Sequence, residues 1–179
     1  MYIPIILGTA RIGRQSEKVS NFMLAEAIKN NLESDIIDVQ DYAIKATDNT
    51  QSSGKAKDLY KKIVKADGFI IVSPEYNHSF PGELKLLLDM FFKEYAKKPV
   101  GFCGVSAGNL GGSRAVEQLR LISIEFSMVP IREALYFSQV HNLFDDKGAI
   151  KDTAYYSRVK IFFDELLWYA KYLKASRDV

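Results

Sequence analysis

Residues 68–92 read Gly-Phe-Ile-Ile-Val-Ser-Pro-Glu-Tyr-Asn-His-Ser-Phe-Pro-Gly-Glu-Leu-Lys-Leu-Leu-Leu-Asp-Met-Phe-Phe. The apolar run 68–73 is typical of a strand that is buried on both faces of a sheet. The run from Gly82 onward is typical of a helix, which we expect over residues 82–97. Between them lies a polar loop that holds Pro74 and Pro81. Because open α/β sheets bind ligands at such strand-to-helix loops, residues 73–82 predict a ligand site.

Strand patterns and helical patterns alternate along the rest of the chain. We expect strands at 2–7, 35–39, 68–73, 99–105 and 129–137, and helices at 16–32, 54–66, 82–97, 112–127 and 153–174. Since crossovers between parallel strands are right-handed, this order predicts an α/β fold with a doubly wound, five-stranded parallel sheet and helices on both faces. No linker divides residues 1–179, so one domain is expected. The polar segment 41–54 is expected to be a mobile loop.

The bulk composition is that of an ordinary globular protein. The 24 basic and 22 acidic residues leave a net charge of only +2, which gives no reason to expect nucleic acid or a membrane as partner. The single cysteine, Cys103, excludes an internal disulfide and fits a reducing compartment. Residues 1–7 resemble neither a signal peptide nor a membrane segment, so we expect a cytoplasmic protein.

A second loop, residues 8–16, has features of a phosphate site. It reads Gly-Thr-Ala-Arg-Ile-Gly-Arg-Gln-Ser and leads into the N-terminus of a helix, which favours an anion. Thr9 and Ser16 offer hydroxyl groups, and Arg11 or Arg14 can bind phosphate in bidentate fashion. The loop is neither a GxGxxG fingerprint nor a Walker loop, so a terminal monophosphate suits it better than a pyrophosphate. The alternative is that Ser16 is an ordinary helix cap and both arginines are solvated.

The other candidate segments also have structural explanations. The prolines of the 73–82 loop could only stiffen a turn, with Tyr76 in the core. The loop 106–114, Ser-Ala-Gly-Asn-Leu-Gly-Gly-Ser-Arg, could admit a flat ligand or serve tight packing. Cys103 is expected to be a buried thiol, and residues 145–148 to be a turn. The two histidines, His78 and His141, receive no role, and no side-chain cluster has the spacing of a metal site.

Three motifs together resemble the NADPH-dependent FMN reductase family, which includes quinone, chromate and azo-dye reductases of the flavodoxin-like fold. The motifs are Gly8-Thr9-x-Arg11-x-x-Arg14-x-Ser16, Ser73-Pro74-Glu75-Tyr76-Asn77-x-Ser79-x-Pro81-Gly82-x-Leu84-Lys85 and Gly108-x-x-Gly111-Gly112. The resemblance spans residues 2 to about 150. The chain departs from the family at Leu86, where Asn is usual, and in a shorter, more polar segment after the second strand.

The resemblance implies FMN as cofactor and NADPH, or NADH, as electron donor. It implies an oxidoreductase that passes hydride through FMN to quinones, flavins, azo compounds or similar acceptors, with no catalytic side chain. Tyr76 and Asn77 would position the ring. The implied FMN contacts are Thr9, Arg11, Arg14 and Ser16 for the phosphate, Pro74, Glu75, Tyr76 and Asn77 for the ribityl chain and the polar ring edge, and Ser106, Ala107, Gly108 and Gly111 for the far edge.

Two other functions remain open at this stage: a flavodoxin-like electron carrier and a redox sensor without NAD(P)H turnover. Such carriers tend to be strongly acidic, which favours the reductase for this slightly basic chain. The last expected helix, 153–174, is apolar around more of its circumference than one core-facing stripe requires. We therefore expect a homo-oligomer, either a homodimer or a homotetramer.

Overall fold

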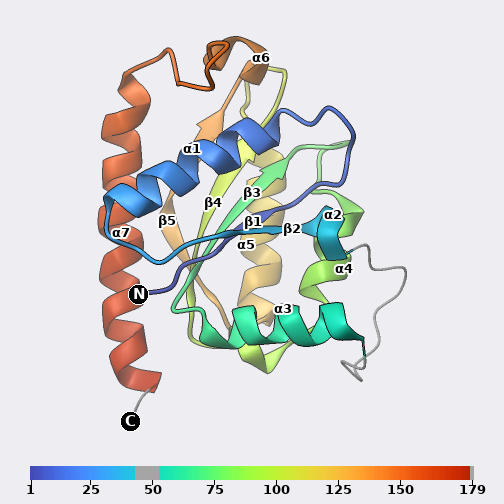
Figure 1. Cartoon of the computed structure of the whole chain (residues 1–179), viewed down its shortest axis with the longest axis vertical. Helices are drawn as coiled ribbons and strands as arrows, with labels where there is room; N and C mark the ends of the chain where they lie inside the picture. Colours follow the sequence, from blue (N-terminus) through green and yellow to red (C-terminus); the bar gives the residue numbers. More distant parts are fainter. Residues whose placement is uncertain (43–52, 178–179) are drawn as a thin grey trace.

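The computed structural model describes residues 1–42 and 53–177, and its centre is one parallel sheet with the order β2-β1-β3-β4-β5 (Figure 1). The strands are β1 (Ile5–Leu7), β2 (Ile36–Asp38), β3 (Phe69–Pro74), β4 (Pro99–Val105) and β5 (Val129–Phe137). All four pairings are parallel, and β1 sits between β2 and β3 in register with Ile36–Asp38 and Ile70–Val72. The predicted doubly wound, five-stranded sheet is confirmed, and strand order reverses beside β1.

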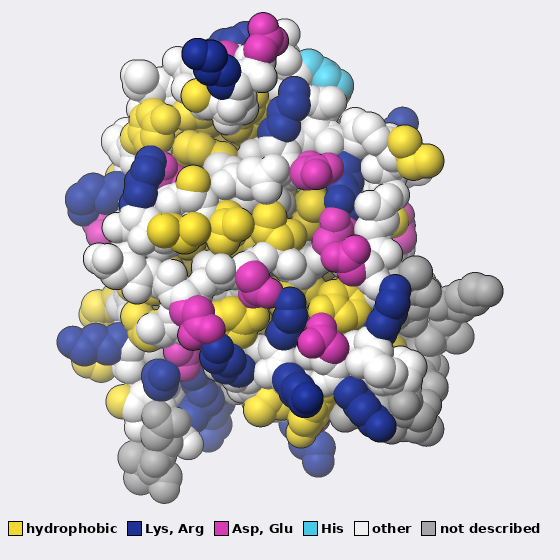
Figure 2. Space-filling view, viewed as in Figure 1, with side chains coloured by type: hydrophobic (Ala, Val, Ile, Leu, Met, Phe, Trp, Pro, Cys, Tyr) yellow, Lys and Arg dark blue, Asp and Glu magenta, His cyan; other side chains and the backbone are white. Residues whose placement is uncertain are grey.

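Helices cover both faces of the sheet (Figure 1), and on the side of the molecule seen in Figure 2 basic and acidic side chains are interspersed. They are α1 (Ser16–Lys29), α2 (Val39–Tyr42), α3 (Gly54–Lys65), α4 (Gly82–Leu88), the 3-10 helix η1 (Lys93–Tyr95), α5 (Ser113–Glu125), α6 (Val140–Leu143) and α7 (Ala154–Arg177). One core contains Ile70 and Val72 with side chains of α1 and α7. The other contains Phe69 and Ile71 with side chains of α3, α4 and α5. Successive β3 side chains thus enter opposite cores, as expected of a strand buried on both faces.

The helix expected over residues 82–97 is wrong beyond Leu88. The structure has the seven-residue α4, a turn, and then η1. Met90, Phe91 and Tyr95 are all buried in the same core as α4. Phe91 and Tyr95 are four residues apart, a spacing that would also place them on one face of a continuous helix. The apolar pattern therefore fits both a continuous helix and the observed turn, and it does not mark where α4 ends.

The other differences concern short elements. The one-turn helices α2 and α6 were not predicted from sequence. Residues 39–42, which overlap the expected 41–54 loop, are helical, and residues 43–52 of that segment lie outside the described part of the chain. The turn expected at 145–148 is confirmed by the bond from the Gly148 N–H to the Asp145 carbonyl oxygen, at 3.0 Å.

The phenol of Tyr95 permits a stability prediction. Tyr95 is fully buried against Phe69 and Phe126, and its hydroxyl has no hydrogen-bond partner among the described residues. Burial raises the pKa of this phenol above its ordinary value. Since an unpaired buried hydroxyl costs about 1–3 kcal/mol, we expect Tyr95→Phe to increase the free energy of unfolding by about 1 kcal/mol. Urea denaturation of the two proteins checks this, and a less stable Tyr95→Phe would show that the hydroxyl has a partner.

Candidate functional site

A cavity of about 430 Å³ opens at the carboxyl ends of the central strands, where open α/β sheets bind their ligands. Its volume lies in the range of small-molecule sites, about 300–1,000 Å³. Its walls come from four segments that lie far apart in the sequence. The lining residues are Arg11, Ile12, Gly13, Arg14, Gln15, Ser16, Pro74, Glu75, Tyr76, Val105, Ser106, Ala107, Val140 and His141.

Ser16 lies on the cavity wall as the first residue of α1. Its side chain caps no backbone group: its hydroxyl oxygen is buried and has no hydrogen-bond partner among the described residues. The ordinary-cap interpretation therefore fails. The residue before it, Gln15, also makes no side-chain cap bond to the first helical turn. A buried hydroxyl at an uncapped helix N-terminus fits a bound phosphate, which accepts hydrogen bonds from both.

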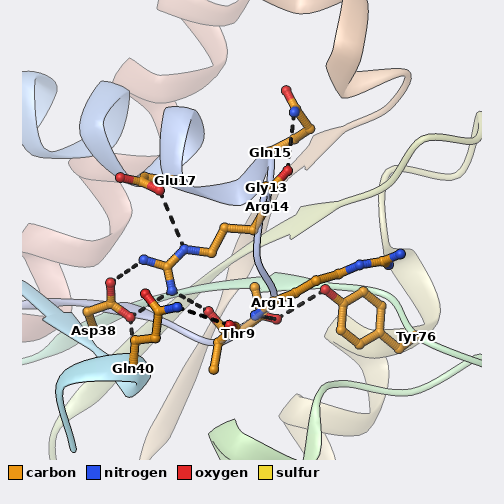
Figure 3. A network of polar contacts seen from close by, with 10 residues as sticks. Thr9, Arg11, Gly13, Arg14, Gln15, Glu17, Asp38, Gln40 and Tyr76 are labelled. Atoms are coloured by element: carbon orange, nitrogen blue, oxygen red, sulfur yellow. Dashed lines mark hydrogen bonds and ion pairs between the residues drawn. The ribbon is translucent and has the colours of Figure 1, made fainter.

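Arg14 is occupied by protein partners (Figure 3). Its guanidinium donates to both carboxylate oxygens of Asp38, at the end of β2, and to the Thr9 carbonyl oxygen at 2.5 Å. The Glu17 carboxylate lies 3.5 Å from its Nε. Burial opposes the charge on Arg14, but the bonds and charges of Asp38 and Glu17 outweigh it and raise its pKa. Arg14 thus fastens the 8–16 loop to β2, and its charge is already compensated.

Arg11 is the arginine of this loop whose charge is available. Its side chain is exposed and takes part in no ion pair within the described chain. The guanidinium carbon lies 5.5 Å from the centroid of the Tyr76 ring, a distance typical of cation–π contact. Arg11 is therefore held at the cavity wall by an aromatic ring and remains able to bind an anion.

Thr9 and Tyr76 join the first two loops to each other. The Thr9 hydroxyl is fully buried, lies 3.0 Å from the Tyr76 hydroxyl, and accepts the Arg11 backbone N–H at 3.2 Å. Tyr76 lines the cavity, whereas Thr9 lies behind the wall. The hydroxyl of Thr9, which the resemblance assigns to the phosphate, has these two partners inside the protein.

Asn77 and His78 form the tip of a two-residue hairpin. The Tyr76 N–H donates to the Ser79 carbonyl oxygen at 2.8 Å, and the Ser79 N–H donates back at 2.9 Å. Asn77 and His78 both have positive φ angles, 50° and 68°, as a type I′ turn requires. Asn is the non-glycine residue that tolerates this backbone best, so the turn itself accounts for Asn77. Neither residue lines the cavity.

Two residues of α5 to which sequence reasoning gave no role, Arg114 and Gln118, hold the 73–82 loop, and Arg114 does so through Glu75. Its carboxylate accepts the Arg114 backbone N–H at 3.1 Å and the Arg114 guanidinium at 2.8 Å. One helical turn further on, the Gln118 amide donates to the His78 carbonyl oxygen at 2.9 Å. Arg114 and Gln118 thus hold the 73–82 loop against α5. Their four-residue spacing places them on one face of α5, but this spacing does not predict which residues they contact.

Some residues of the third loop, 106–114, line the cavity, and others pack against the rest of the protein. Ser106 and Ala107 line the cavity, and Gly108 faces open space just beyond them. Gly111 is buried with a φ of 58°, and a Cβ there would lie 2.7 Å from the Tyr136 Cβ. Gly111 therefore serves tight packing, which was the alternative explanation of this glycine turn.

His141 and Val140 complete the wall, although sequence reasoning gave them no role. They belong to α6, whose start is fixed by the bond from the Val140 N–H to the Ser106 carbonyl oxygen, at 3.1 Å. The only signal in the sequence was their position just after the last strand, where the carboxyl edge of the sheet lies.

The single cysteine does not line this cavity. Cys103 is fully buried in β4, so the prediction of a buried thiol is confirmed, and this burial raises the pKa of the thiol above its ordinary value. Within residues 1–42 and 53–177, no three His, Cys, Asp or Glu side chains form a group able to hold a metal ion. The residues that line the cavity can bind and orient a phosphate-bearing cofactor.

The sheet order and the position of the cavity define a flavodoxin-like α/β protein. A flavodoxin from Pseudomonas aeruginosa superimposes on 98% of the chain, and the chain on 98% of it, with a TM-score of 0.55 and 16% identity. The chain belongs to the NADPH-dependent FMN reductase family, whose model matches residues 1–142. It is therefore an oxidoreductase that uses FMN and takes its electrons from NADPH.

Two further relatives extend over nearly the whole chain. An FMN-dependent NADPH-azoreductase from Staphylococcus haemolyticus is 27% identical over 173 residues, which cover 91% of this chain and 92% of the relative. FerB, a flavoenzyme NAD(P)H:(acceptor) oxidoreductase from Paracoccus denitrificans, has a TM-score of 0.80 at 17% identity and 97% coverage of both chains. The structural similarity to FerB shows that the two proteins share a fold.

Proposed function

We propose that this protein, as one FMN-binding domain over residues 1–179, transfers hydride from NAD(P)H through FMN to azo compounds, quinones or related planar acceptors. The observation that carries the proposal is the buried, unpartnered Ser16 hydroxyl at the uncapped N-terminus of α1, inside a cavity of about 430 Å³. Membership of the NADPH-dependent FMN reductase family identifies FMN as the cofactor, and the similarity to an azoreductase supports azo compounds as acceptors. Bound FMN supplies the redox chemistry, since it can accept hydride and release two electrons.

The cavity residues divide by task in this proposal. Ser16, Arg11 and the backbone of residues 12–16 hold the FMN phosphate. Pro74, Glu75 and Tyr76 on one wall, and Ser106 and Ala107 on the other, orient the rest of the cofactor. Thr9 and Arg14 act indirectly, because they hold the loop that carries Arg11 and Ser16. Asn77 and Gly108 lie just outside the cavity walls, where an extended ring could contact their backbone.

Steady-state kinetics with an azo dye and with a quinone test the proposed reaction. A single site used in turn by NADPH and the acceptor predicts ping-pong kinetics, with parallel double-reciprocal lines for both acceptors. NADPH oxidation that does not respond to either acceptor would contradict the acceptor class. Electron transfer that occurs only from a protein donor would favour the carrier alternative.

We also propose a cytoplasmic homo-oligomer that associates through α7. Along this helix Ile161, Trp168 and Tyr172 are 55%, 57% and 54% exposed, and their spacing of seven and four places them in one stripe. In the described residues no helix has the length and apolar character to cross a membrane. A second copy of the chain that packs against this stripe would bury its exposed apolar side chains.

Light scattering checks the oligomer prediction. We expect the unmodified protein to have the mass of a dimer or tetramer, and Ile161→Asp combined with Trp168→Lys to give a folded monomer. Leu121 and Ile124 on α5, which are also exposed, provide the matched control. If Leu121→Asp with Ile124→Asp dissociates the protein and the α7 pair does not, the interface lies on α5 instead.

A further inference from the structure

His141 has a fixed place on the cavity wall that the proposed FMN contacts do not use. It lies on α6, which Figure 1 shows at the carboxyl-end side of the sheet, close to α1. The Gln139 N–H donates to the Gly108 carbonyl oxygen at 3.0 Å, and Val140 is bonded to Ser106, so the third loop holds the start of α6. At its other end Phe144 packs edge-on against Phe22 of α1, with ring centroids 6.3 Å apart.

The charges around the cavity are almost balanced without His141. Arg14 is compensated by Asp38 and Glu17, and Glu75 is compensated by Arg114. Arg11 is the cation of the cavity wall that has no ion pair within the described chain. Among the neighbouring segments, α1 also carries the exposed Lys18, and the residues after α6 include Asp145 and Asp146, with Asp145 bonded to the backbone of its own turn.

The imidazole of His141 is exposed and makes no hydrogen bond or ion pair with any described residue. Histidine is the side chain whose charge most readily changes under physiological conditions, and a phosphate monoester loses its second proton near pH 6. A phosphate bound at Ser16 and Arg11 would share the cavity with this side chain.

We propose that His141 is a proton-linked contact for the phosphate of FMN, a role that rests on the FMN site proposed above. Protonated His141 adds a second positive charge to that of Arg11, and the bound phosphate dianion in turn favours the protonated imidazole. The contribution of His141 to FMN binding is therefore expected to be larger at pH 6 than at pH 9. Neutral His141, at high pH, contributes no charge to the phosphate.

Fluorescence titration of flavin into the protein freed of cofactor measures this linkage. The compared proteins are the unmodified chain, His141→Gln, and His78→Gln as control, since the chain has only these two histidines and His78 does not line the cavity. We expect the Kd of His141→Gln for FMN to exceed the unmodified value about five- to tenfold at pH 6 and to equal it at pH 9, as expected for one close, solvent-screened charge pair. His78→Gln should keep the unmodified pH dependence.

Riboflavin, which lacks the phosphate, distinguishes the possible outcomes. Its Kd should be the same for the unmodified chain and His141→Gln at each pH. Equal FMN affinities for these two proteins at pH 6 would overturn the role of His141 while leaving the FMN site intact, whereas failure of the unmodified chain to bind FMN would overturn the site itself. If His141→Gln instead raises KM for NADPH and not for NADH, with FMN binding unchanged, the histidine contacts the nucleotide phosphate and the assignment to FMN is wrong.

Discussion

Arg14→Ala is expected to lower the free energy of unfolding by about 3 kcal/mol and to abolish tight FMN binding. The substitution removes the guanidinium that holds Asp38 and the Thr9 carbonyl oxygen, and it leaves the largely buried Asp38 carboxylate without its cation. Breaking one side of a buried ion pair typically costs about 3–5 kcal/mol, and the remaining exposure of Asp38 places this case at the low end. Urea denaturation of the cofactor-free proteins measures the effect without interference from FMN.

Arg11→Ala provides the matched comparison in the same loop. Arg11 is exposed and has no ion pair among the described residues, so its loss should change the free energy of unfolding by less than about 0.5 kcal/mol. It should nevertheless weaken FMN binding by about 10- to 100-fold, the value of a charge-assisted bond to phosphate. The opposite pattern, with Arg14 dispensable for stability and Arg11 dispensable for FMN, would mean that the two arginines have exchanged roles.

Gly111→Ala is expected to destabilise the protein by about 3 kcal/mol or more. A Cβ at this position would lie 2.7 Å from the Tyr136 Cβ and 2.9 Å from the Tyr136 carbonyl carbon, and backbone cannot move aside as a flexible side chain can. The positive φ of 58° adds strain for any residue with a Cβ. Thermal and urea denaturation measure the loss of stability. If Gly111→Ala is insoluble, its yield of folded protein is compared with that of the unmodified chain.

Gly108→Ala is the control for this prediction. Nothing lies within 4 Å of the Cβ that it would add, and its φ is not in the left-handed region. Its stability should therefore stay within about 0.5 kcal/mol of the unmodified chain. Equal effects of the two substitutions would show that the glycines of this turn share one task, as the family motif alone implied.

The fold was predictable because its signals are local. Each strand is a short apolar run bounded by polar residues, and β3 with its loop could be recognised from residues 68–82 alone. The helix after it was overestimated because the run from Leu84 to Phe92 is apolar almost throughout. Such a run satisfies helical spacing whether or not the chain bends, so the end of α4 at Leu88 could not be predicted from the pattern.

The candidate site was predictable as three loops but not as individual contacts. Arg14 fits a phosphate ligand by sequence, and its actual partner, Asp38, lies 24 residues away on another strand. In the same way, Gly111 has the sequence context of a ligand-facing glycine, but in the structure it packs against Tyr136, which lies 25 residues later in the chain. The only sequence signal for His141 was its position just after the last strand, because its place on the wall depends on bonds from α6 to the third loop. Contacts between distant segments depend on the three-dimensional fold, and the spacing of residues along the chain does not predict them.

The most direct test of the central claim is anaerobic addition of NADPH to the FMN-loaded protein while the visible flavin absorption is recorded. We predict stoichiometric FMN and rapid loss of its visible band after one equivalent of NADPH, followed by full recovery when an azo dye or a quinone is added. Flavin that stays oxidised in the presence of NADPH, or a chain that retains no FMN, would contradict the proposal that this cavity houses an NADPH-dependent FMN reductase site.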